Sequence, residues 1–177
     1  MYAPRRLLSA LVLTLLTAAA CERSATEARV DAPSTAPRLA TNVSTVCKGS
    51  AVPTGYVILS FGNYYTCGFS SSGYPTAMTI GLPASPENVC QQSTVPSGWV
   101  ISSLSRSYSC DEYSPTSSSY KNMYVIKIPT ATYEYVCDVS PIPSTYTTTT
   151  YRYYTSSCDQ YGNGSPSWPN AREIRKI

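Results

Sequence analysis

Apolar and polar residues alternate in short stretches through most of the chain, and prolines, glycines and serines separate those stretches. Residues 56–61 read Tyr-Val-Ile-Leu-Ser-Phe, and residues 78–82 and 123–128 are similarly rich in apolar and β-branched side chains. Such residues pack well on a pleated surface. Pro83 and Pro129 end the last two stretches, because proline cannot donate to a strand ladder. After residue 20 no window keeps the i, i+3, i+4 apolar spacing of a helix, so the sequence predicts an all-β fold.

One arrangement of residues occurs three times, starting at Val46, Val89 and Val136. In each copy a cysteine follows the valine, a serine lies three residues after the cysteine, and a proline lies three residues after the serine. Self-similarity at a nearly fixed period is the signature of a repeat architecture. The chain therefore predicts three units of four short strands each. The predicted units are residues 46–88, 89–135 and 136–177.

Two architectures fit three such units. The favoured one is a linear array of small tandem β-repeats, each pinned by a disulfide and each contacting only its neighbours. The alternative is a β-trefoil, whose core needs several large apolar residues from every unit. The third unit has four threonines at 147–150, where the first has Val-Ile-Leu-Ser at 57–60. This favours the array, and it is typical either of a polar capping repeat or of drift in a duplicated segment.

Six of the seven cysteines belong to the repeats. A unit of about 43 residues buries too little apolar surface to fold without help. Only a pairing that every copy repeats respects the symmetry of the sequence, and each bridge should contribute about 3 kcal/mol by closing its loop. A zinc site is the rival use of these cysteines, but the chain has no C-x-x-C and no histidine. The predicted disulfides are Cys47–Cys67, Cys90–Cys110 and Cys137–Cys158.

The N-terminus has the three parts of an export signal, predicted as residues 1–20. Two arginines precede a 14-residue apolar run, which ends in three alanines and Cys21. Small residues before a cysteine resemble the lipobox of bacterial lipoproteins. The resemblance implies that Cys21 is acylated and that a lipid anchor holds the protein in the cell envelope, at the outer membrane or cell surface. The alternative is cleavage at the same bond followed by simple secretion.

The unpaired cysteine supports the anchor, because six cysteines form three pairs and only Cys21 is left over. Residues 21–45 are rich in Ala, Ser, Thr and Pro and show no apolar period. The sequence predicts that this segment is the lipid anchor and a flexible linker.

The amino-acid composition excludes several classes of function. Only 13% of the residues are charged and the formal net charge is +3, so the chain lacks the clustered Lys and Arg of a nucleic-acid binder. The absence of histidine excludes Ser-His and Cys-His catalysis and histidine metal sites. Asp111 and Asp159 each follow a second cysteine, a position that favours a turn over a pair of catalytic carboxylates. We therefore expect no enzymatic activity, no cofactor and no nucleic-acid partner.

Aromatic residues recur once per unit in two series, and all six are candidates for ligand binding. Exposed rings at fixed spacing can stack on sugars or peptides. The position after the turn proline favours a different role, as a small core packed against the disulfide. The series after the turn is Tyr56, Trp99 and Tyr146, and the series near the end of each unit is Tyr74, Tyr120 and Trp168.

Together these observations predict a cell-envelope lipoprotein with a repeat-built β-module for binding or adhesion. Its expected partners are the membrane, through the lipid anchor, and a glycan or an envelope protein. The alternatives are a purely structural envelope protein and a secreted carbohydrate-binding protein.

Overall fold

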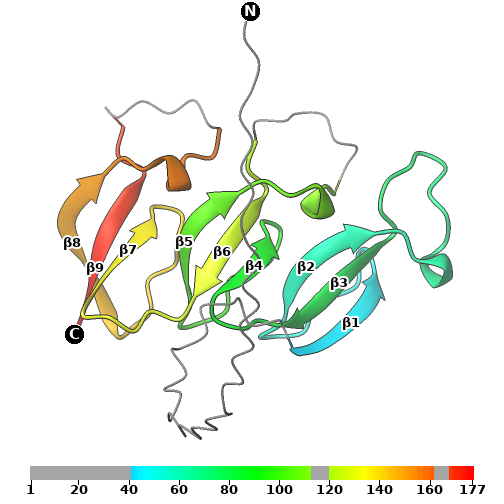
Figure 1. Cartoon of the computed structure of the whole chain (residues 1–177). Helices are drawn as coiled ribbons and strands as arrows, with labels where there is room; N and C mark the ends of the chain where they lie inside the picture. The colour runs from blue at the N-terminus through cyan, green and yellow to red at the C-terminus, as the bar shows by residue number, and fades with distance from the viewer. Residues whose placement is uncertain (1–40, 113–119, 162–167) are drawn as a thin grey trace, which may run out of the picture. The chain divides into compact units, whose positions relative to one another are not determined.

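The computed structural model describes residues 41–112, 120–161 and 168–177, all of which belong to one structural unit. In this part of the chain the strands form three separate three-stranded antiparallel sheets, one in each repeat (Figure 1). The prediction of an all-β fold built from three tandem disulfide-pinned repeats is confirmed. The strands are β1 (Thr41–Cys47), β2 (Val57–Gly62), β3 (Ala77–Leu82), β4 (Glu87–Cys90), β5 (Val100–Ser105), β6 (Met123–Lys127), β7 (Tyr133–Cys137), β8 (Tyr146–Tyr153) and β9 (Ala171–Lys176).

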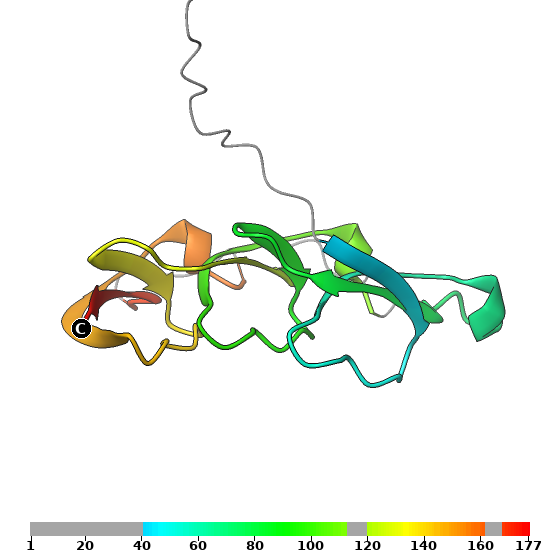
Figure 2. The ribbon, with the colours of Figure 1, turned by 90° about the horizontal axis from the view of Figure 1, so that it is seen from below.

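All three sheets have the same strand order. The last strand of each repeat lies in the middle and pairs with the other two. The connection from the first strand to the second leaves the sheet as a loop (Figure 2). A β-trefoil would need one closed barrel shared by all units, and three separate sheets do not form one. No helix among the described residues is long and apolar enough to cross a membrane.

Within its described residues each repeat has three strands, where the sequence predicted four. The segment before the second cysteine forms a short 3-10 turn in place of a strand. In the second repeat the amide of Asn122 bonds both the N–H and the C=O of Ser107, at 2.9 and 3.0 Å, and Asn170 does the same for Thr155. This clamp bends the backbone so that the second cysteine reaches back to the first. The turns are η1 (Tyr65–Cys67), η2 (Tyr108–Cys110) and η3 (Ser156–Cys158).

The three predicted disulfides are present. Each joins the end of the first strand to the 3-10 turn, with Cα–Cα separations of 5.2, 5.1 and 5.2 Å for Cys47–Cys67, Cys90–Cys110 and Cys137–Cys158. Every bridge therefore closes within its own repeat.

The first strand of every sheet begins earlier than the repeat boundaries set from the sequence. Strand β1 starts at Thr41, inside the segment 21–45 that was predicted to be a flexible linker. Strands β4 and β7 start at Glu87 and Tyr133, ahead of positions 89 and 136. In β1 the polar residues Ser44 and Thr45 pair with Ile80 and Thr79 of the central strand. A strand at a sheet edge needs only one paired side, so a polar, exposed sequence can form it.

The core of each repeat extends into the next repeat. Ile58, Met78 and Ile80 of the first sheet pack in one buried cluster with Cys90 and Cys110 of the second repeat. The second sheet does the same for the third disulfide: Ile101, Leu104 and Ile126 share a buried cluster with Cys137 and Cys158. The first and second sheets therefore each cover the disulfide of the repeat that follows.

A backbone bulge and a serine connect neighbouring repeats. The register of β2 against β3 shifts between Ile58 and Ser60, and that of β5 against β6 shifts between Ile101 and Ser103. At the bulge, the N–H of Ile58 donates to Ser93 Oγ. The N–H of Ile101 donates to Ser140 Oγ at 2.8 Å. These serines occupy one of the positions that are identical in all three repeats.

Candidate functional site

The aromatic series after the turn proline belongs mainly to the interior. Tyr56 and Trp99 are half-buried and Tyr146 is buried. Tyr56 packs against the cluster that contains Cys90 and Cys110, and Trp99 packs against the cluster that contains the third disulfide. The sequence suggested a core against a disulfide, and the structure adds that this disulfide belongs to the following repeat. The hydroxyl of Tyr146 donates to the carbonyl of Ala131 at 2.7 Å.

The second aromatic series is exposed. Tyr74, Tyr120 and Trp168 lie between the 3-10 turn and the last strand of their repeats, and Trp168 is 77% exposed. More exposed rings occupy the same turns and loops: Tyr65, Phe69, Tyr108 and Tyr161. We refer to the seven residues Tyr65, Phe69, Tyr74, Tyr108, Tyr120, Tyr161 and Trp168 as the aromatic loops.

Sequence reasoning missed four of these seven residues, because it considered only positions that recur in every repeat. Tyr65 and Tyr108 align with one another at the start of a 3-10 turn, but Ser156 has this position in the third repeat, and Phe69 and Tyr161 align with neither. The signal that could have found them is local: large aromatic side chains within the Ser- and Gly-rich segment that follows each second strand. Such a segment contributes little to a core.

Contacts between rings hold several of the aromatic loops in place. Tyr65 and Phe69 meet edge to face, with centroids 5.7 Å apart, a favourable geometry for aromatic pairs. The rings of Tyr120 and Tyr161 also lie 5.7 Å apart, which joins the loops of the second and third repeats. The guanidinium of Arg106 lies 5.0 Å from the ring centroid of Tyr108.

Hydrogen bonds fix Tyr120 between two repeats. Its hydroxyl donates to Gln91 Oε1 at 3.0 Å and accepts from Gln160 Nε2 at 2.6 Å. The neighbouring Lys121 donates its backbone N–H to the carbonyl of Gln160 at 2.9 Å. The hydroxyl of this exposed ring already acts as both donor and acceptor, so the side chain loses little further conformational entropy when a ligand binds. More of the free energy of its contact with the ligand then contributes to affinity.

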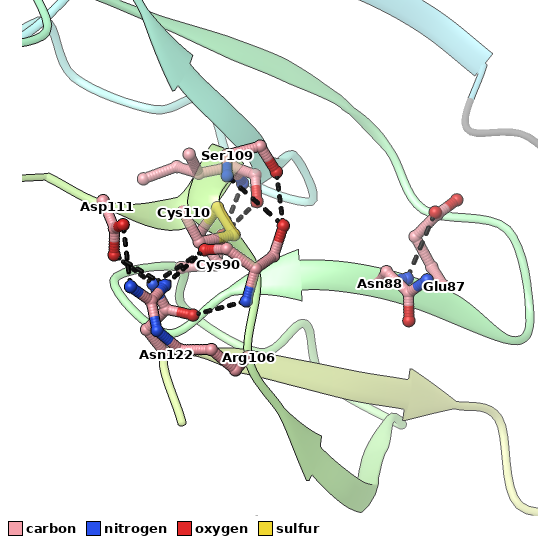
Figure 3. Close-up of a disulfide and its surroundings, with 11 residues drawn as sticks. Glu87, Asn88, Cys90, Arg106, Ser109, Cys110, Asp111 and Asn122 are labelled. Carbon is pink, nitrogen blue, oxygen red and sulfur yellow. Dashed lines mark hydrogen bonds and ion pairs between the residues drawn. A yellow bond between two sulfur atoms is a disulfide. The ribbon is translucent and has the colours of Figure 1, made fainter. Parts of the chain in front are cut away.

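A polar network beside the second disulfide supports the loop base (Figure 3). Arg106 forms an ion pair with Asp111 at 2.7 Å, and the buried Asn122 donates to the same carboxylate at 2.8 Å. Asp111 is the residue that ends η2, and Asp159 ends η3. Both aspartates therefore occupy turn positions, as the sequence analysis expected, and serve to hold the loop.

A small hollow lies at the junction of the first and second repeats. Its volume is about 240 Å³, and residues 52–56 of the first repeat and 92–94 of the second line it. Tyr56 and the polar side chains of Gln92 and Thr94 face this space together. At the second junction the equivalents of Gln92 and Thr94 are Val139 and Pro141, so the two junctions differ in polarity.

The third repeat has a tyrosine cluster of its own. The ring centroid of Tyr135 lies 6.3 Å from that of Tyr151 and 5.5 Å from that of Tyr153. A hydrogen bond to Glu173, together with the negative charge of that carboxylate, raises the pKa of Tyr135. The corresponding positions of the other repeats are not aromatic, so periodicity could not reveal this cluster.

No three or more Cys, Asp or Glu side chains among the described residues come together in a way that could hold a metal ion. The acylation candidate Cys21 and the predicted signal 1–20 lie outside the described residues. Comparisons of the chain with protein-family models, with curated proteins and with solved structures found no match.

Proposed function

We propose that this protein is an exported cell-envelope lipoprotein, anchored through Cys21, whose repeats form a non-enzymatic binding module. The observation that carries the proposal is the set of exposed rings in the aromatic loops. Burial of an aromatic ring stabilises a protein by roughly 25 cal/mol for each Å² of apolar surface that is removed from water, and an exposed ring lacks this stabilisation. Seven such rings on the loop segments of three consecutive repeats are best explained by contact with a ligand.

A glycan is the ligand class that these loops fit best. Aromatic rings present flat apolar faces on which the C–H face of a sugar can stack, and tyrosine hydroxyls add hydrogen bonds at the ring edge. The low charge of the chain suits a neutral polyhydroxylated ligand. Repetition of the loops along the chain suits a polymer, since several weak contacts on one strand add up to useful avidity.

The test is binding of the full mature protein to a glycan array and to isolated cell-wall material. The variant Phe69→Ser, Tyr108→Ser, Trp168→Ser removes one ring from each repeat. Each ring should cost about 1–3 kcal/mol of binding, by analogy with a nucleic-acid base stacked on an aromatic side chain. The matched control is Tyr133→Ser, which removes an exposed ring outside the loops. A triple variant that binds as well as the control would refute the proposal.

The anchor has its own test. Intact mass after detergent extraction should show a diacylglyceryl adduct on a chain that begins at Cys21, and Cys21→Ser should release the protein from the membrane fraction. A mature protein that begins at Cys21, carries no lipid and remains in the soluble fraction would contradict anchoring. In that case the binding module would belong to a secreted protein without a lipid anchor.

A further inference from the structure

The three disulfides differ in their access to solvent. Cys90, Cys110 and Cys137 are at most 1% exposed and Cys158 is 7% exposed. Cys47, by contrast, is exposed and Cys67 is partly exposed. The bonds have the same position in their repeats, so their own geometry does not explain the difference.

Coverage by the preceding repeat explains it. The second disulfide packs beneath the side chains of Ile58, Met78 and Ile80, and the third packs beneath the equivalent residues of the second sheet. The first repeat has no repeat before it in the described part of the chain, and its disulfide belongs to none of the buried clusters there.

We infer that Cys47–Cys67 is a site of thiol–disulfide exchange, and that the other two disulfides are protected by the array. This inference does not depend on the proposed binding function. The reacting partner is a thiol, either a small molecule or the exposed cysteine of a redox protein. A thiolate must approach a disulfide sulfur directly to react, and only the first disulfide offers that approach without opening of a junction.

The reaction is balanced in two steps. The thiolate attacks the sulfur of Cys47, the more exposed residue of the two, and forms a mixed disulfide while Cys67 leaves as a thiolate and takes up a proton. A second thiolate then attacks the sulfur of the reagent in the mixed disulfide and releases Cys47 as a thiolate, which is protonated in turn. The protein gains two thiols, and two reagent thiols, from two glutathione molecules or from one dithiothreitol, are oxidised to one disulfide.

The experiment exposes the intact mature protein to a low concentration of dithiothreitol or glutathione at neutral pH. Samples are quenched with iodoacetamide over time and mapped by mass spectrometry. Alkylation at Cys47 and Cys67 should appear at least about tenfold faster than at the other four repeat cysteines, because those require local opening before they react. In urea all three pairs should react at similar rates. Similar rates in the native protein, or faster reaction at Cys90–Cys110, would overturn the inference.

Matched serine variants test the protection. Ser93→Ala removes the side chain that accepts from Ile58 N–H, so it should accelerate reaction of Cys90–Cys110 and leave Cys137–Cys158 unchanged. Ser140→Ala should do the reverse. Ser50→Ala at the exposed equivalent position is the control and should change no rate. If neither junction variant changes its own disulfide, coverage by the preceding repeat is not the cause of protection.

Discussion

One serine hydroxyl joins the second repeat to the first sheet, and an equivalent serine joins the third repeat to the second sheet. A bulge leaves an amide of the second strand without a partner in the ladder, and Ser93 or Ser140 of the next repeat accepts from it. Ser93 is 8% exposed and Ser140 is 3% exposed, so an unpaired amide there would cost about 1–3 kcal/mol. Ser50 has the same place in its repeat but is exposed. The serine is therefore a junction residue in the second and third repeats, where a sheet precedes it.

Trp99 provides a prediction at the scale of the residue. Because the indole is half-buried against the cluster that holds the third disulfide, Trp99→Ala should lower the free energy of unfolding by about 2 kcal/mol, roughly half the cost of deleting a fully buried ring. Urea denaturation measures this change. Binding to a glycan through the aromatic loops should remain. Unchanged stability with lost binding would instead make Trp99 a ligand contact.

At the scale of the element, β8 differs from β2 and β5. Its register against β9 shifts between Thr148 and Arg152, and the bulge contains more residues than in the other sheets. Thr149 Oγ1 donates to the carbonyl of Glu173 at 3.3 Å and accepts from Tyr151 N–H at 3.1 Å. At this bulge the hydrogen-bond partner of the backbone groups is a threonine of the same repeat, where the other two sheets use a serine of the next repeat. This difference supports the interpretation of the third repeat as a cap.

This interpretation leads to a gain-of-association experiment. Thr147→Val with Thr148→Ile restores the apolar pair with which β2 and β5 pack against the following repeat. The altered end should then accept the exposed first repeat of another molecule, so sedimentation velocity should show oligomers that grow with protein concentration. Thr145→Val, at an exposed position just before the strand, is the control. A double variant that stays at the mass of the parent would argue against a capping role.

The connection between β6 and β7 gives a pH-dependent prediction. Glu134 accepts from the N–H groups of Thr130 and Ala131 at 3.0 and 3.1 Å and pairs with Lys127 at 2.6 Å. Burial raises the pKa of this carboxyl, but the hydrogen bonds and the lysine charge together lower it below its ordinary value. A lowered pKa stabilises the fold above the ordinary carboxyl range, and this contribution is lost as the pH falls through the lowered value.

Glu134→Gln should therefore reduce stability at neutral pH and reduce the loss of stability on acidification. Urea denaturation of both proteins between about pH 3 and pH 7 measures this difference. If the variant and the parent lose the same free energy over that range, the carboxylate does not stabilise the connection.

At the scale of the whole molecule, the sequence predicted the features that lie within a single repeat, namely its disulfide and most of its strands. The spacing of Cys47 and Cys67, repeated twice, was enough to assign all three disulfides, and β-branched stretches located the strands. The packing of a sheet over the next disulfide was not predictable, because it depends on contacts between copies. The 3-10 turns were missed since Tyr64 to Cys67 has the composition of a strand, and the clamp that bends the equivalent segments comes from distant residues such as Asn122.

The direction of coverage has a consequence for biogenesis. A chain emerges N-terminus first, both from the ribosome and across a membrane, and its leading parts fold first. Here the sheet that shelters a disulfide always precedes that disulfide in the chain. The second and third cysteine pairs therefore each reach a surface that is already formed, so these two bonds can be covered one unit at a time as they are oxidised. Duplication of an internal unit would preserve this order, so the protein could change its length without any new kind of contact.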